Sequence, residues 1–247
     1  MPRACGAEQP SQTMADMGRT DPGLPGLRLL QLISPNLPTG AFTYSQGLEW
    51  AVECGWIQNR DDTRHWLQSV LDDSLQTLEL PILIRLFNAA GNNSHSEFQH
   101  WTHWLYASRE TAELRNEEQQ RARALLMVLR QLPDSEHWPE LEDWQPSLRR
   151  CQLAGYALAA QRWQIPLEDL LVGYTWSWLE NAVAAAIKLV PLGQTEGQSL
   201  LYRFSTEINT AVEYALALDD DAIGASTPAL AIASSLHETQ YSRLFRS

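Results

Sequence analysis

Apolar residues recur at steps of three and four along almost the whole chain after residue 26. This spacing places them on one face of an α-helix. The run Trp66, Val70, Leu71, Leu75 and Leu78 shows it clearly. No stretch alternates as a half-buried strand would, and no internal repeat is visible. The pattern predicts an all-α protein, a single globular helical bundle of about eight to ten helices.

Helix stop and start signals divide the first part of this pattern. Residues 1–26 show no periodicity and are expected to form a disordered tail. A short helix follows from Leu27 and ends at Ser34-Pro35. The helical pattern resumes near Thr43 and runs to Gly55. Asn59 is expected to cap the next helix, and Pro81 either kinks that run or starts a new helix.

The remaining signals organise residues 96–247. The proline-rich segment 133–146 is predicted to be a loop inside one domain that covers residues 27–247. Thr195 and Gln198 have the spacing of a capping box. Thr227-Pro228 is expected to begin the final helix. The other helices are expected at residues 96–107, 110–132, 148–163 and 166–190.

Residues 170–187 are apolar enough to be weighed as a membrane span. Glu180 is their only formal charge, and it lies beside Asn181 in mid-segment. Burying these groups in lipid is costly, so the segment is interpreted as the central helix of a soluble protein.

The composition restricts the cellular compartment and the classes of partner that are expected. The 247 residues carry a net charge of −12, which disfavours nucleic acid and anionic membranes as partners. The three cysteines are odd in number and form no CxxC pair. A disulfide framework or structural zinc site is therefore not expected. With no signal peptide in the sequence, a cytoplasmic location is predicted.

The chain lacks the common catalytic motifs. It contains no GxxxxGK[ST] phosphate loop, no GxGxxG opening a βα unit, no HExxH and no GxSxG. It is therefore expected to be neither an enzyme nor the holder of a cofactor.

Two sets of residues are candidates for metal sites. His100 and His103 share a helix face, but no cysteine or acid stands at a matching position, so a solvated pair is favoured. The acidic pairs and triplet at 61–62, 72–73 and 219–221 lack the DDxxD spacing of an all-α prenyl-transfer enzyme. No metal site is predicted.

Four stretches, taken together and in order, are similar to one protein family. They are residues 34–49, 108–115, 176–194 and 237–247. This set resembles UreF, a urease accessory protein, from about Leu27 to the end of the chain. The tail before residue 27 and the acidic 133–146 segment lie outside the resemblance.

The resemblance implies a non-catalytic, cytoplasmic all-α protein that tends to form a homodimer. Proteins of this kind bind UreD (also called UreH), recruit the GTPase UreG, and dock on apo-urease for GTP-dependent nickel insertion. An alternative is that the chain regulates the UreG GTPase cycle directly. An enzyme is the third possibility, against which the missing motifs weigh.

The matching stretches supply the candidate partner-binding residues. The stretch 237–247 is either a tail that becomes ordered when it binds a partner or a frayed helix end. Its aromatic, apolar and arginine side chains are suited to a protein interface. These are Tyr241, Arg243, Leu244, Phe245 and Arg246. A second candidate is the rigid loop that contains Pro35, Pro38, Gly40 and Phe42. It either binds a partner, with little loss of conformational entropy, or is a structural turn that joins two helices.

Two further sets come from the helices. Arg109, Glu110 and Glu113 are expected on a polar helix face, solvated or partner-binding, with Arg109 and Glu113 paired at i, i+4. Lys188 either stabilises the C-terminal end of its helix by interacting with the helix dipole or contacts a partner. Glu180 is hypothesised to line an internal water path.

Overall fold

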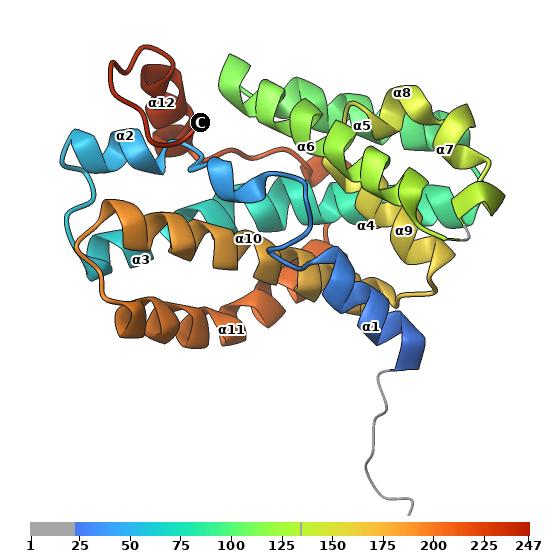
Figure 1. The fold of residues 1–247 in the computed structure, drawn as a ribbon, viewed down its shortest axis with the longest axis horizontal. Helices are drawn as coiled ribbons and strands as arrows, with labels where there is room; N and C mark the ends of the chain where they lie inside the picture. Colours follow the sequence, from blue (N-terminus) through green and yellow to red (C-terminus); the bar gives the residue numbers. More distant parts are fainter. Residues whose placement is uncertain (1–22, 134) are drawn as a thin grey trace, which may run out of the picture.

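The computed structural model describes residues 23–133 and 135–247. Over these ranges the chain is helical and contains no strand, as the periodicity predicts. Three 3₁₀ turns, η1 (Ala41–Thr43), η3 (Ser135–His137) and η4 (Asp220–Ala222), connect longer elements (Figure 1). The helices are α1 (Gly23–Leu32), α2 (Leu48–Glu53), α3 (Arg60–Val70), η2 (Leu71–Glu79, π-helical), α4 (Leu80–Gly91), α5 (His95–Ser108), α6 (Ala112–Gln131), α7 (Glu140–Asp143), α8 (Gln145–Leu148), α9 (Gln152–Arg162), α10 (Leu167–Leu189), α11 (Gln194–Leu216) and α12 (Pro228–His237).

The α3, η2 and α4 segments follow one another without a break and form a continuous rod. Asn59 begins it as predicted, because its side chain accepts hydrogen bonds from the N–H groups of Asp61 and Asp62. Pro81 lies in the first turn of α4, directly after the π-helical stretch, so it marks the start of a new helix, as one of the two predicted alternatives has it, without interrupting the rod. Proline leaves the carbonyl four residues earlier without its donor. That carbonyl, of Thr77, accepts the N–H of Gly224 instead, at 3.2 Å.

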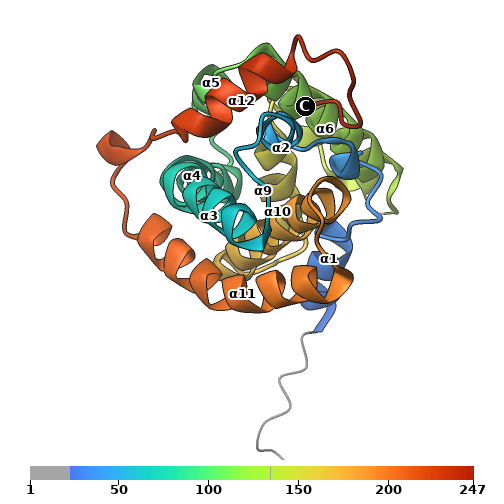
Figure 2. The ribbon, with the colours of Figure 1, turned by 90° about the vertical axis from the view of Figure 1, so that its left-hand side faces the viewer.

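Helix α4 is the innermost element of the bundle. Leu80, Ile82, Leu83 and Leu86 are all fully buried, and the polar side chains of this helix, Arg85 and Asn88, lie three residues apart on one face. It packs against α5, α9, α10 and α11. Figure 2 looks nearly along the rod and shows these helices around it. The segment expected to be central, now within α10, packs beside α4 and against α11.

Several expected boundaries differ from the structure. Helix α1 begins at Gly23, because Pro25 is tolerated in a first helical turn, where an N–H needs no partner. The rest of the expected tail, residues 1–22, lies outside the described residues. Helix α2 begins only at Leu48, since Gln46 and Gly47 have φ values of 53° and 78°, in the left-handed region.

Two other predictions are corrected by local hydrogen bonding and packing. The expected capping box at Thr195 is displaced, because Glu196 accepts the Gly193 N–H at 2.9 Å and α11 starts at Gln194. The segment 133–146 is not a plain loop. It holds η3, α7 and α8, with Trp138 and Trp144 in the core. No described helix is both long and apolar enough to cross a membrane.

Candidate functional site: the carboxy-terminal segment and the charges beneath it

Segments far apart in the sequence meet where the chain ends. The N–H of Arg246 donates to the carbonyl of Thr43 at 2.8 Å, and the N–H of Ser45 donates to the backbone oxygen of Ser247 at 2.6 Å. Lys188 Nζ, at the end of α10, lies 5.6 Å from the centre of the Phe245 ring. Figure 1 shows the chain end beside α2 and α12. The loop after α1, the end of α10 and residues 238–247 therefore form one continuous surface.

Residues 238–247, here the carboxy-terminal segment, are folded against their own chain. The Glu49 carboxylate on α2 accepts the N–H groups of Leu244 at 2.6 Å and Phe245 at 2.8 Å. Phe245 is only 5% exposed. The sequence suggested a tail that orders on binding, or a frayed helix end. The structure instead shows a segment already ordered, because its backbone donors and one aromatic ring find partners within the chain.

A buried histidine joins this segment to α6. His237, the last residue of α12, has no exposed side-chain surface. Its Nδ1 lies 2.8 Å from Glu113 Oε2 and its Nε2 lies 3.2 Å from Glu49 Oε2. Arg243 Nη1 lies 2.8 Å from the other oxygen of Glu113. Two carboxylates, an imidazole and a guanidinium thus hold the segment in place.

The outer side of the segment is apolar and basic. Tyr241 is fully exposed, Leu244 is 66% exposed, and Phe42 from the η1 turn is 64% exposed. The basic side chains here, also exposed, are Lys188, Arg243 and Arg246. The carboxylates of Glu49 and Glu117 lie beneath these side chains, while Glu53 and Glu238 are exposed at the other end of the segment.

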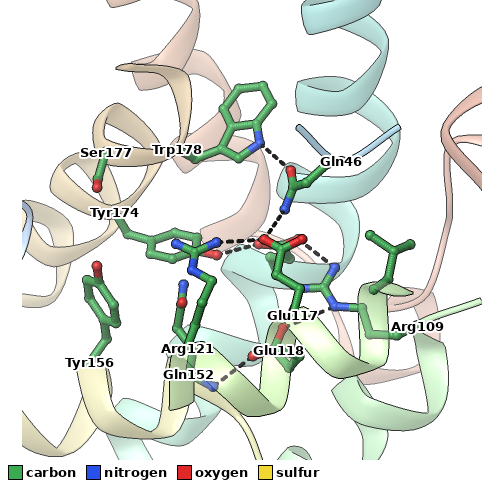
Figure 3. Close-up of a pocket in the computed structure, with 12 residues that line it drawn as sticks. Gln46, Arg109, Glu117, Glu118, Arg121, Gln152, Tyr156, Tyr174, Ser177 and Trp178 are labelled. Atoms are coloured by element: carbon green, nitrogen blue, oxygen red, sulfur yellow. Dashed lines mark hydrogen bonds and ion pairs between the residues drawn. The ribbon is translucent and has the colours of Figure 1, made fainter. Parts of the chain in front are cut away.

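Beneath the surface lies a network of buried charges, shown in Figure 3. Arg109 binds two carboxylates, with Nη1 2.8 Å from Glu79 and Nη2 2.7 Å from Glu118. Tyr174 donates its hydroxyl hydrogen to Glu79. The predicted pairing of Arg109 with Glu113 is wrong, because Arg109 caps the end of α5 and α6 begins only after Thr111. The two residues do not share a helix.

A second ion pair links this network to the carboxy-terminal segment. Arg121 lies 2.9 Å from Glu117 on the same helix face. Gln46 donates to Glu117 at 3.0 Å and accepts from the indole N–H of Trp178 at 3.2 Å. The Ser247 hydroxyl donates to the other oxygen of Glu117 at 3.0 Å. Glu117 therefore contacts Arg121 and Gln46, as Figure 3 shows, and also the end of the chain.

The network holds its members in fixed charge states. Burial raises the pKa of Glu79, but the charge of Arg109 and hydrogen bonds from Tyr174 and Arg109 outweigh it, so this pKa lies below its ordinary value. Burial lowers the pKa of Arg109, and Glu79 and Glu118 more than reverse this. Burial and then Glu79 raise the pKa of Tyr174 well above its usual value. The pKa shifts of Glu79, Arg109 and Tyr174 therefore all favour a charged Glu79 and Arg109 beside a neutral Tyr174.

The space inside the network is small. An enclosed hollow of about 20 Å³ is bordered by Glu79, Arg109 and Glu117, with Ser177 on its wall. This is room for about one water molecule and for no substrate. A second hollow, bordered by Glu117 and Asn181, adjoins it. Glu180 is half-buried and borders neither hollow, so its hypothesised place on an internal water path stays a prediction.

The other predicted site residues lie on the surface. Glu110 is exposed between α5 and α6. Pro35 and Pro38 are exposed in the loop that leads to η1, and Gly40 has a φ of 75° that favours glycine. Within the described residues, no group of three or more histidine, cysteine or acidic side chains is arranged to hold a metal ion.

Several residues of the site were not predicted from the sequence. Glu79 is a lone acid within the apolar run 78–84, and that isolation could have marked it as buried and paired. Glu117 and Glu118 stand in a helix rich in charges, and nothing local distinguishes them. Glu49 and His237 lie within the matching stretches but have no pairing visible in the sequence.

Comparisons with known proteins show which family this chain is similar to. A family model described as UreF matches residues 57–205. A protein named urease accessory protein UreF from Alcanivorax borkumensis is 61% identical over 222 residues, which cover 89% of this chain and 97% of that protein. Proteins of the same name from Pseudomonas putida KT2440 and Alkalilimnicola ehrlichii are 50% and 49% identical, each over at least 90% of this chain and 97% of their own length. This chain belongs to the UreF family of urease accessory proteins.

Proposed function

We propose that the chain is a non-catalytic cytoplasmic scaffold for urease maturation. In this proposal it binds UreD/UreH, recruits the GTPase UreG, and brings both to apo-urease for GTP-dependent assembly of the nickel centre. The convergence of three matching stretches into one ordered surface, with Leu244, Phe42 and Lys188 exposed on it, carries the proposal.

The physical character of the surface suits partner recognition. Exposed aromatic and arginine side chains are typical centres of binding energy at protein interfaces. The segment that presents them is already folded, so docking requires little further ordering. Basic side chains on an acidic protein also favour one orientation of an acidic partner surface. We therefore assign partner binding to Tyr241, Leu244 and Arg246, together with Lys188 and Phe42.

The experiment is co-purification of the full chain with UreD and UreG, comparing single surface variants. Leu244→Glu places a charge at the centre of the proposed interface without removing a buried contact. We expect it to abolish the complex while leaving the melting temperature unchanged. Tyr202→Glu is the matched control, because Tyr202 is 84% exposed on α11, on the other side of the bundle (Figure 1). A Leu244→Glu variant that still assembles normally would contradict the assignment.

A second function is direct regulation of the UreG GTPase cycle. The Glu117 contacts favour it, because they join the partner-facing segment to the buried Arg121. Turnover of GTP by isolated UreG, with and without the chain, separates the two. A passive scaffold leaves the rate unchanged, and a regulator alters it.

The homodimer implied by the family resemblance is a separate part of the proposal. Light scattering on the purified chain measures the mass directly. A monomer at every concentration tested would remove this part and leave the scaffold proposal standing.

A further inference from the structure

The environment of His237 is unusual for a buried histidine. The ring is fully enclosed, and each of its nitrogens faces a carboxylate oxygen from a different helix, Glu49 on α2 and Glu113 on α6. Glu49 also accepts two backbone N–H groups of the carboxy-terminal segment, and Glu113 also binds Arg243.

Other ionisable groups lie close by. Glu238, the next residue, accepts the N–H groups of Ala112 and Glu113 at the start of α6. Glu53 on α2 accepts a hydrogen bond from Gln240. Both of these carboxylates belong to exposed residues, so the ionisable groups in direct contact with the ring are Glu49 and Glu113.

The contacts define the protonation state that fits. An ionised carboxylate can only accept hydrogen bonds, so both ring nitrogens must donate, and only the doubly protonated imidazolium does so. Loss of either proton would set a nitrogen lone pair against a carboxylate oxygen in a site without water access. Because the same Glu49 oxygen also accepts the Phe245 N–H, repulsion there disturbs the bond that holds the segment.

We propose that His237, as an imidazolium, is the positioning residue for the carboxy-terminal segment, and that its deprotonation releases the segment and withdraws the partner-binding surface. The released part is residues 238–247, since Arg243, Leu244 and Phe245 all bind Glu49 or Glu113. The last step, loss of partner binding, rests on the proposed function. The release itself does not, and it is measured on the chain alone.

The experiment is amide hydrogen exchange on the full chain from about pH 6 to about pH 9.5, a range in which imidazole can lose its charge. Rates are converted to protection factors, which removes the intrinsic dependence of exchange on pH. We expect protection of Leu244, Phe245 and Arg246 to fall at least about tenfold across the range. Protection of α4 should stay constant and report that the fold is intact.

Two variants separate positioning from simple packing. His237→Gln cannot donate from both sides, so we expect low segment protection at every pH, with α4 still protected. Glu113→Gln removes one of the two carboxylates that favour the imidazolium, so we expect the loss of protection to begin at lower pH than in the wild type. A purely structural histidine would not move this transition.

The outcomes are distinguishable. Segment protection that does not depend on pH, or that is unchanged in His237→Gln, would overturn the proposal. A pH-dependent release together with UreD and UreG binding that ignores pH would support the positioning role and count against the proposed partner surface instead.

Discussion

Replacing Arg109 by methionine tests the buried charge network. The Arg109 side chain is 12% exposed, and its partners Glu79 and Glu118 are each 6% exposed. Removing the shared cation leaves two buried carboxylates without their counter-charge. Breaking a buried pair in this way costs about 3–5 kcal/mol. Tyr174 and the Gln152 N–H, 2.7 Å from Glu118, still donate to the carboxylates, so we expect the lower end, about 3 kcal/mol.

The loss should depend on pH in a definite direction. In the wild type the pKa of Glu79 lies below its ordinary value of 4.5, so its contribution to stability is present above about pH 4.5 and disappears as the pH falls through the folded-state value. In Arg109→Met the raising effect of burial remains while the largest opposing effect is lost, so we expect the folded-state pKa of Glu79 to rise. The free energy of unfolding of the variant then falls furthest below that of the wild type at neutral pH, and the difference becomes smaller as the pH falls towards about 5.

The assay is urea unfolding followed by circular dichroism at several pH values between about 5 and 8. Arg60→Met is the control, because Arg60 and Asp61 form an exposed pair at 3.5 Å and its loss should cost less than about 0.5 kcal/mol. Adding Glu79→Gln to Arg109→Met should restore part of the stability by removing one unpaired charge. A loss below about 1 kcal/mol, or one that is equal at all pH values, would refute the reasoning.

Two further predictions concern local geometry, and the same unfolding assay checks both. Gly47 has a φ of 78°, and an added Cβ would lie 2.9 Å from the backbone nitrogen of Ser234. At Gly40, with a φ of 75°, the nearest atom to an added Cβ would be the Thr43 hydroxyl oxygen at 4.0 Å, an ordinary contact. Gly47→Ala should therefore destabilise by clearly more than the roughly 1 kcal/mol expected of Gly40→Ala, and equal losses would contradict this. Asn59→Ala should cost about 1 kcal/mol by removing the cap of α3, while Ser94→Ala should cost little, because Ser94 makes no side-chain cap bond; similar losses would show that the cap is not the cause.

Helix prediction from the sequence succeeded where the signal was local. Apolar spacing located the long helices between residues 59 and 237 but missed the short α7 and α8, and Asn59 and Thr227-Pro228 marked real helix starts. Such signals depend on contacts within three or four residues, which the sequence displays directly. Errors arose where the backbone left the ordinary regions, as at Gln46 and Gly47, whose conformations depend on what packs against them.

Some residues of the candidate site could be predicted from the sequence, but not the residues with which they interact. The matching stretches contain Lys188, Phe245 and Arg246, and the structure brings all three together. Their partners were not predictable. Arg109 looked like part of an exposed helix face, yet it binds Glu79, thirty residues earlier in the chain.

The sequence by itself determined that this protein is an all-α member of the UreF family, because helical periodicity and family motifs are properties of short stretches. Only the tertiary structure decided which charges are buried together and that His237 lies between Glu49 and Glu113, 188 and 124 residues away. The physical reason is that an ion pair requires only proximity in space. The distance between two charged groups is set by how the helices pack, and no local pattern of residues encodes it.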